Sequence, residues 1–215
     1  MQTSVVLLDL ILPLACGGCD APGTRWCAGC AAELVARAAE PRLVSPRLDP
    51  GVPVFSLGRY AAGRRRAIVA VKERGRADLV APLAGALHLG LTRLLDWGLL
   101  AAPLTLVPAP TRWSAARRRG GDPVTRVAAA ATADIPGVTV VQALRLTGFA
   151  RDSVGLSVAD RQRNLADRVR VVRPVAGPVL IVDDIVTTGA TAGESVRALQ
   201  TAAVSVHGVL VLADA

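Results

Sequence analysis

Two adjacent carboxylates followed by a loop rich in hydroxyls are the most chemically distinctive feature of the sequence. Asp183 and Asp184 follow the apolar run Val179–Val182, and the chain continues Ile-Val-Thr-Thr-Gly-Ala-Thr. Backbone N–H groups of such a loop at a helix N-terminus point at an anion, which predicts a phosphate site. The carboxylates can accept hydrogen bonds from the two hydroxyls of a ribose attached to that phosphate. The candidate phosphate-binding residues are Thr187, Thr188, Gly189, Ala190 and Thr191.

Other phosphate motifs do not fit this string. A Walker A loop ends in Gly-Lys-Ser/Thr, and a dinucleotide fingerprint needs Gly-x-Gly-x-x-Gly after the first strand. The remaining alternative is structural: an acidic strand end followed by an ordinary capped helix.

Four cysteines form the second distinctive group. Cys16 and Cys19 make one Cys-x-x-Cys turn, and Cys27 and Cys30 make another seven residues later. Two such turns can present four thiolates to one tetrahedral ion, and Zn²⁺ is the favoured metal because it is soft enough for sulfur and has no redox chemistry. The alternatives are a pair of disulfides or a redox Cys-x-x-Cys. A site with four sulfur ligands leaves no position for a catalytic water, so we expect a structural zinc site.

Lys72 is the only lysine in a chain whose other cations are all arginine. A compact ammonium in place of a planar guanidinium predicts a point charge near a pyrophosphate, and a surface cation is the alternative. We also expect three arginine clusters to border the phosphate site: Arg64–Arg66, Arg117–Arg119 and Arg161–Arg163. No residue is identified as a general base.

The elements that position these residues alternate between strands and helices after residue 104, which predicts a mostly parallel sheet with ligands at the carboxyl ends of its strands. Asp122-Pro123 reads as an N-cap followed by proline at the first helical position. The expected strands are 52–60, 104–107, 138–141, 169–172, 179–182 and 204–212, and the expected helices are 31–40, 78–96, 122–133, 157–167 and 190–201. Prolines 41, 46, 50 and 53 are expected to end regular structure between an N-terminal cysteine segment (1–50) and the main domain (51–215).

Composition limits the class of protein. The chain of 215 residues is 52% hydrophobic and 20% charged, which excludes a disordered chain. Aromatic residues make up 3%, so stacking platforms for single-stranded nucleic acid are scarce. The net charge of +8 is compatible with nucleic acid, an anionic surface or a polyphosphate.

The N-terminal apolar run, Val5–Ala15, superficially resembles a secretory or lipoprotein signal. No basic residue precedes it, Asp9 interrupts it, and Pro13 stands where a lipobox has an aliphatic residue. The run is also too short to span a bilayer. We therefore expect a cytoplasmic protein without a membrane span.

Taken together, these motifs resemble the ComF family over nearly the full length of the chain, and the Asp-Asp string resembles the ribose-phosphate motif of type I phosphoribosyltransferases. The resemblance includes Ile68–Gly75, Val107–Pro110 and the arginines that follow, and Leu156–Asn164. Family members usually carry Phe-Asn-Gln where this chain has Gly121-Asp122-Pro123, and often a Gln near Asp152-Ser153.

The resemblance implies a fold, a ligand and partners. It implies a type I phosphoribosyltransferase-like domain that binds 5-phosphoribosyl 1-pyrophosphate (PRPP) with Mg²⁺, in which Asp183 and Asp184 hold the ribose and act in catalysis. The pyrophosphate loop would then contain Ala109, Arg112, Arg117 and Arg119. The activity is transfer of the phosphoribosyl group to an unidentified acceptor. The alternative is a non-catalytic role in DNA uptake during competence, with a helicase or other competence protein and single-stranded DNA as partners. A homo-oligomer is left open.

Overall fold

The computed structural model describes residues 14–110, 122–147 and 168–215. The helix expected at 157–167, the arginines at 112–119 and 161–163, and nearly all of the apolar run at 5–15 lie outside these ranges.

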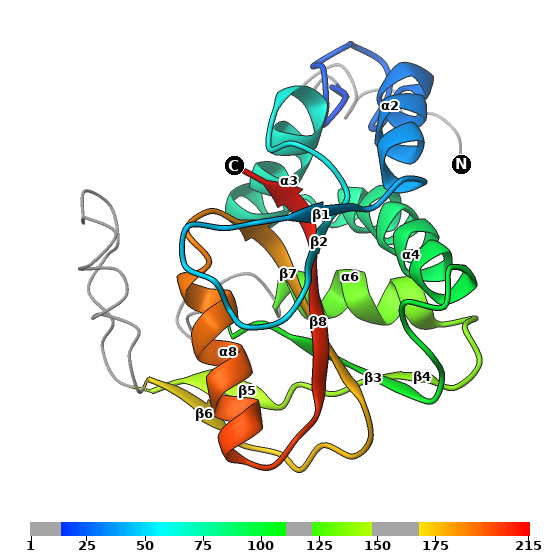
Figure 1. The fold of residues 1–215 in the computed structure, drawn as a ribbon. Helices are drawn as coiled ribbons and strands as arrows, with labels where there is room; N and C mark the ends of the chain where they lie inside the picture. The colour runs from blue at the N-terminus through cyan, green and yellow to red at the C-terminus, as the bar shows by residue number, and fades with distance from the viewer. Residues whose placement is uncertain (1–13, 111–121, 148–167) are drawn as a thin grey trace, which may run out of the picture.

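A six-stranded sheet of order β1-β2-β8-β7-β3-β4 forms the centre of the molecule (Figure 1). Every neighbouring pair is parallel except β1 and β2, which confirms the expected mostly parallel sheet. A separate antiparallel pair, β5-β6, lies beside it. The strands are β1 (Arg42–Val44), β2 (Val54–Ser56), β3 (Leu104–Pro108), β4 (Val138–Val140), β5 (Leu144–Leu146), β6 (Val169–Val171), β7 (Val179–Val186) and β8 (Val206–Asp214).

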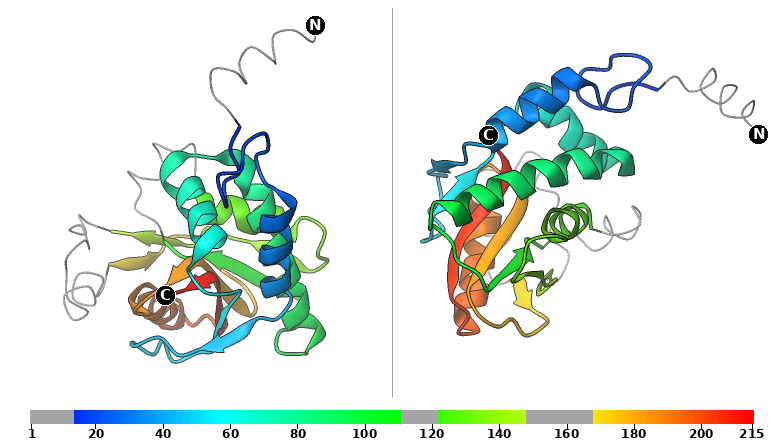
Figure 2. Two further views of the ribbon diagram at one scale, coloured as in Figure 1. Left: turned by 90° about the horizontal axis from the view of Figure 1, so that it is seen from above. Right: turned by 90° about the vertical axis from the view of Figure 1, so that its right-hand side faces the viewer.

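Helices cover both faces of the sheet. α4 and α6 contact one another, α4 also contacts β8, and α6 contacts β3 and β7, whereas α8 contacts β6, β7 and β8. The cysteine segment lies with α2 and α3 at the end of the molecule remote from β5-β6 (Figures 1 and 2). The helices are α2 (Ala28–Ala38), α3 (Ala62–Arg74), the 3₁₀ turn η1 (Ala77–Leu79), α4 (Val80–Asp96), α6 (Pro123–Thr132) and α8 (Ala190–Thr201).

The central strand β7 shows how the sequence builds these layers. Leu180 and Val182 belong to the core under α4 and α6, whereas Val179 and Ile181 belong to the core under α8. A parallel strand that is covered on both faces has to be apolar on both, which explains the continuous run before Asp183. The alternation continues past that run, so the two aspartates leave the strand on opposite faces.

Several elements differ from the expectation. The prolines do not end all regular structure, because Arg42–Val44 forms an edge strand whose register with β2 pairs Leu43 with Phe55. α3 is not among the expected helices, because its apolar residues do not form one face along its length and three arginines stand in its first turns. β7 extends to Val186, so Asp183 and Asp184 lie inside the strand and not after it. The boundary proposed at residue 50 stays a prediction.

One helical stretch among the described residues, Ala77–Asp96, is long and apolar enough to cross a membrane by length and composition alone. Its leucines Leu79, Leu83, Leu87 and Leu91 are fully buried in the core under the sheet. That burial is typical of a core helix, because a spanning helix would turn its apolar side chains toward lipid.

Candidate functional site

The Thr187–Thr191 loop joins the carboxyl end of β7 to the N-terminus of α8. Gly189 precedes the helix at φ +88°, a left-handed conformation that glycine adopts without strain. The Thr188 hydroxyl accepts a hydrogen bond from the Ala190 N–H at 3.4 Å, while the Thr187 side chain is exposed. The loop therefore presents backbone donors and the positive end of a helix dipole, the arrangement that binds phosphate.

Asp183 lies on the same side of the sheet as this loop. Both line one small pocket, together with Ile181 and Val209 from the strands beneath. The Asp183 carboxylate accepts a hydrogen bond from the Asp184 N–H at 2.8 Å, which fixes its orientation over the loop. A ligand with a phosphate on the loop and hydroxyl groups near Asp183 matches this arrangement.

Asp184 points to the other side of the sheet and pairs with Lys72 of α3. The Lys72 Nζ atom lies 2.6 Å from Asp184 Oδ2. Burial would lower the pKa of the Lys72 ammonium, but the charge and hydrogen bond of Asp184 raise it. The sequence singled out Lys72 as the only lysine, and the structure places it beside the carboxylate pair; its pairing with Asp184 had no sequence signal.

Asp183 has no ion pair with a residue in 14–110, 122–147 or 168–215. Its burial raises the pKa of the Asp183 carboxyl well above the usual range, and the neighbouring charge of Asp184 raises it further. Lys72 counteracts part of this effect. Perturbed carboxyl groups of this kind are concentrated at functional sites.

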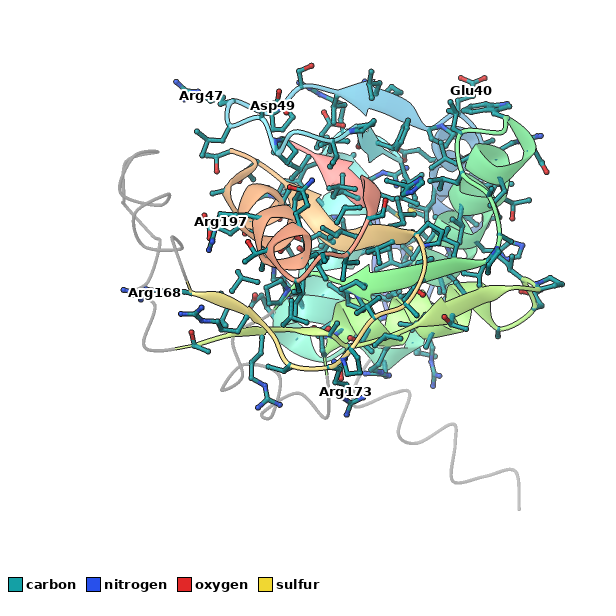
Figure 3. All side chains as sticks on the ribbon, turned by 60° about the horizontal axis from the view of Figure 1, so that its bottom comes forward. Glu40, Arg47, Asp49, Arg168, Arg173 and Arg197 are labelled. Carbon is teal, nitrogen blue, oxygen red and sulfur yellow. The ribbon has the colours of Figure 1, made fainter. Side chains whose placement is uncertain are left out.

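A loop at residues 45–50 lies directly against the Thr187–Thr191 loop. The Leu48 N–H donates to the Thr188 carbonyl at 2.8 Å. A Cβ at Gly189 would lie 2.2 Å from the Leu48 carbonyl oxygen, so the approach of the two backbones requires glycine there. Arg47 and Asp49 project outward from the 45–50 loop (Figure 3). The segment that follows the cysteine module therefore packs against the Thr187–Thr191 loop.

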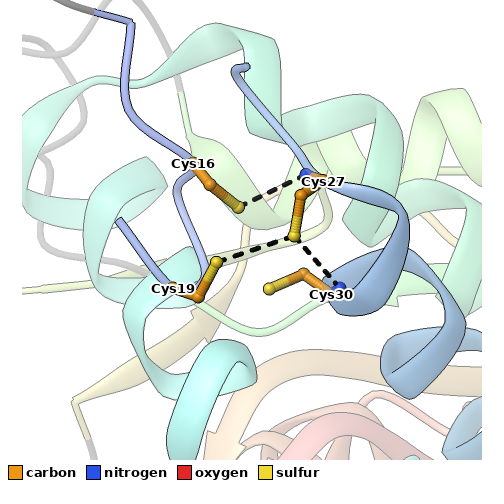
Figure 4. A group of neighbouring side chains, drawn as sticks. All are labelled: Cys16, Cys19, Cys27 and Cys30. Atoms are coloured by element: carbon orange, nitrogen blue, oxygen red, sulfur yellow. Dashed lines mark hydrogen bonds between the residues drawn. The ribbon is translucent and has the colours of Figure 1, made fainter. Parts of the chain in front are cut away.

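The four cysteine sulfurs lie within 4.8 Å of one another (Figure 4). The Cys19 and Cys27 Sγ atoms are 3.6 Å apart, too far for a disulfide bond of about 2 Å. In a tetrahedral site with Zn–S bonds of about 2.3 Å, the sulfurs stand about 3.8 Å apart. All four cysteines are free thiols, and their arrangement fits a single metal ion such as Zn²⁺.

Backbone amides prepare Cys16 to be a thiolate. Burial alone would raise the pKa of the Cys16 thiol, but N–H donors from Cys27, Cys19 and Gly18 outweigh burial and lower the pKa to about 6. The Cys27 N–H lies 3.3 Å from Cys16 Sγ, and the Cys30 N–H lies 3.4 Å from Cys27 Sγ. Such donors orient metal-bound sulfurs and stabilise their charge.

Other predicted residues have different surroundings. Ala109 is buried, and its N–H donates to the Val182 carbonyl at 2.8 Å, so it extends the pairing of β3 with β7. Arg112, Arg117 and Arg119 lie outside the described residues. Arg64 is buried and donates to the Leu212 and Leu34 carbonyls, so this member of the 64–66 cluster supports the fold and is not part of a phosphate rim.

Comparisons with known proteins add little to this geometry. No family model matches the chain, and no curated protein matches it. Among solved structures, the chain is similar to UMP synthase of Leishmania donovani, with 16% sequence identity over 87% of this chain and a TM-score of 0.39. The match spans about a third (32%) of that structure's length. The fold therefore rests on the sheet and its flanking helices, and the site rests on the residues described above.

Proposed function

We propose that this chain is a phosphoribosyltransferase-like protein of the ComF type that binds PRPP at the carboxyl end of β7. One observation carries the proposal: Asp183 and the Thr187–Thr191 loop line the same pocket at the N-terminus of α8. Parallel α/β sheets bind ligands outside the carboxyl ends of their strands, and this is such an edge.

Different residues bind different parts of PRPP. The 5-phosphate binds the loop N–H groups and the N-terminus of α8. The ribose lies across β7, so that its hydroxyls donate to Asp183 on the side of the loop and to Asp184 on the side of Lys72. Lys72 neutralises Asp184, so the pair carries less negative charge when the pyrophosphate approaches.

The chemistry is displacement of pyrophosphate at C1 of the ribose by a nucleophile. Positive charge develops on the ribose ring in the transition state, and the two carboxylates stabilise it through space. Mg²⁺ would travel with the pyrophosphate and neutralise part of its charge, and it would need few ligands from the protein.

Calorimetric titration with PRPP and Mg²⁺ tests the proposal. We expect the wild type to bind, and Asp183→Asn and Asp184→Asn to bind at least roughly tenfold more weakly, which corresponds to about 1.4 kcal/mol. Asp49→Asn is the matched control, because it removes an exposed carboxylate from the 45–50 loop and should bind as the wild type does. A wild type that does not bind PRPP refutes the proposal.

The four-cysteine module favours a second candidate, in which a ComF-type protein uses the pocket without turnover and acts in DNA uptake with a competence helicase and single-stranded DNA. Release of pyrophosphate separates an enzyme from such a binding protein. Contact with nucleic acid would appear as an affinity that falls steeply with salt concentration.

A further inference from the structure

Among the described residues, one buried carboxylate oxygen at the start of α6 has no hydrogen-bond partner. Asp122 caps α6 and is 8% exposed. Its Oδ2 atom accepts hydrogen bonds from the Thr125 N–H at 3.1 Å and the Thr125 hydroxyl at 2.6 Å. Its Oδ1 atom is the single buried side-chain nitrogen or oxygen without a partner within residues 14–110, 122–147 and 168–215. An unsatisfied buried carboxylate oxygen is costly and calls for an explanation.

The neighbours of Asp122 hold this carboxylate in one orientation. The Gln142 amide donates to the Thr125 hydroxyl at 2.8 Å. Because that hydroxyl accepts from Gln142, its own hydrogen is available for Asp122 Oδ2. Asp122 Oδ2 therefore accepts two hydrogen bonds from Thr125, whose hydroxyl is oriented by Gln142, and both lone pairs of Oδ1 stay available.

The position of Asp122 relates this oxygen to the proposed reaction. Pro123 and Val124, the next two residues, line a small pocket together with Lys72 and Asp184. This pocket has about 240 Å³ of empty space, its open mouth included. α6 also contacts β3 and β7, the two strands whose carboxyl ends border the site. The unpartnered acceptor thus belongs to the segment that faces the Lys72–Asp184 pair.

We propose that Asp122 is the general base of the transfer reaction, an inference that rests on the proposed function. The nucleophilic nitrogen of the acceptor forms a bond to C1 of the ribose, and the bond from C1 to the pyrophosphate oxygen breaks. The bonding electron pair leaves with the pyrophosphate, and the proton of the nitrogen passes to Asp122 Oδ1. A carboxylate can only accept here, so the acceptor is a compound with an N–H group, such as an amine or a nitrogen heterocycle.

Asp122→Asn and Asp122→Ser test this assignment with two readouts: PRPP affinity by calorimetry, and pyrophosphate release with ammonia, adenine and uracil as N–H nucleophiles. Both variants keep an oxygen that can cap α6. We expect both to bind PRPP as the wild type does and to release pyrophosphate on the order of 100- to 10,000-fold more slowly. Added formate should restore part of the activity of Asp122→Ser, because it supplies a carboxylate in the space that serine leaves.

The control and the possible outcomes distinguish a general base from a structural cap. Asp134→Asn, an exposed carboxylate just after α6, is the matched control and should behave as the wild type does. A wild type that does not bind PRPP refutes the proposed function and this inference with it. A wild type that binds PRPP but releases no pyrophosphate overturns only the base. Variants with unchanged rates, or a slow Asp122→Ser variant that formate does not rescue, make Asp122 a structural cap.

Discussion

At the scale of single residues, Lys72 sets the charge of the carboxylate pair. The Lys72 ammonium, 2.6 Å from Asp184, offsets the charge of that carboxylate, while burial and the Asp184 charge raise the pKa of Asp183 and favour its neutral form. Two carboxylates with one ammonium would repel the proposed anionic ligand less than two bare carboxylates would.

Replacing Lys72 by Arg tests whether the site needs a compact charge. We expect Lys72→Arg to weaken PRPP binding roughly tenfold, because the larger planar guanidinium cannot occupy the same position beside Asp184. Calorimetry measures the effect, with Arg74→Lys on the exposed side of the same helix as the control. Equal affinity for Lys72→Arg and wild type would remove Lys72 from the binding site.

Asp183→Asn should stabilise the protein while it weakens binding. Folding raises the pKa of Asp183, so ionisation of this carboxyl opposes folding. The opposition is absent below the ordinary pKa of about 4 and grows as the pH rises toward the raised value. We therefore expect the variant to gain stability relative to the wild type over this window and to melt at a higher temperature at neutral pH.

Thermal denaturation of both proteins across this pH range measures the difference. Parallel curves for wild type and Asp183→Asn would show that the Asp183 charge does not affect folding. A gain in stability together with a loss of binding would be the trade-off typical of functional sites.

The sequence indicates the chemistry proposed for the site, but not its geometry. Residue types and order indicated a phosphate loop after Asp183 and Asp184, and singled out Lys72. The pairing of Lys72 with Asp184 needed the fold, because it joins residues of α3 and β7 that are far apart in the chain. Asp122 was correctly predicted as a cap, but the unpartnered state of its second oxygen depends on surroundings that sequence does not describe.

At the scale of elements, the 45–50 loop restricts the side chains that fit in the Thr187–Thr191 loop. Four prolines suggested a linker without regular structure, yet β1 joins the sheet and Arg42 donates to Asp214 at 2.6 Å. These anchors hold the 45–50 loop against Thr188 and Gly189. Edge pairing of three residues is too short to show a periodic pattern in a sequence.

Gly189→Ala should destabilise the protein more than Gly177→Ala does. Both glycines have positive φ, at +88° and +73°, so each substitution costs about 1–3 kcal/mol of backbone strain. Only Gly189 also faces a backbone oxygen, that of Leu48, whereas a Cβ at Gly177 meets nothing within 4 Å. Chemical denaturation measures the free energy of unfolding of both variants. Equal losses would show that the 45–50 loop moves away from a Cβ at position 189 without loss of stability.

The helix α3 shows that the role of an arginine cannot be inferred from its position in the sequence alone. Its first turns carry Arg64, Arg65 and Arg66, which the sequence predicts to border the phosphate site. The structure buries Arg64 against main-chain carbonyls, places Arg65 over the Tyr60 ring at 5.8 Å, and directs Arg66 to the Gly18 carbonyl. Charge counts do not distinguish arginines that bind a ligand from those that bind the protein's own backbone.

At the scale of the whole molecule, the cysteine module rests on the main domain through α3 and η1. Arg66 donates to the Gly18 carbonyl, and Arg76 donates to the Ala15 carbonyl at 3.3 Å. A Cβ at Gly17 would lie 2.3 Å from Leu79, so the first Cys-x-x-Cys turn packs closely on that core leucine. Metal binding should therefore stabilise more than the module itself.

Removal of the metal should lower the melting temperature of the whole protein. If loss of the packing around the module lowers the free energy of unfolding by about 2 kcal/mol, the melting temperature of a chain of this size falls by about 4–8 °C. We expect one zinc ion per chain by elemental analysis, and the same fall after chelation or in Cys16→Ser. A chelator should have no further effect on Cys16→Ser, and a metal-free protein that melts like the untreated one would contradict a structural metal.

The strand order has a consequence for synthesis on the ribosome. Strands β2, β3 and β4 emerge early, but β2 and β3 are not neighbours, and β7 and β8, which separate them, are made last. Until then the nascent chain exposes strand edges that have no partner. The pairing of β2 with β8 is also distant in sequence, because it joins Val54 to Val209. Long-range parallel pairing of this kind folds slowly and invites aggregation, so this chain should depend on chaperones during production more than a protein with local pairing does.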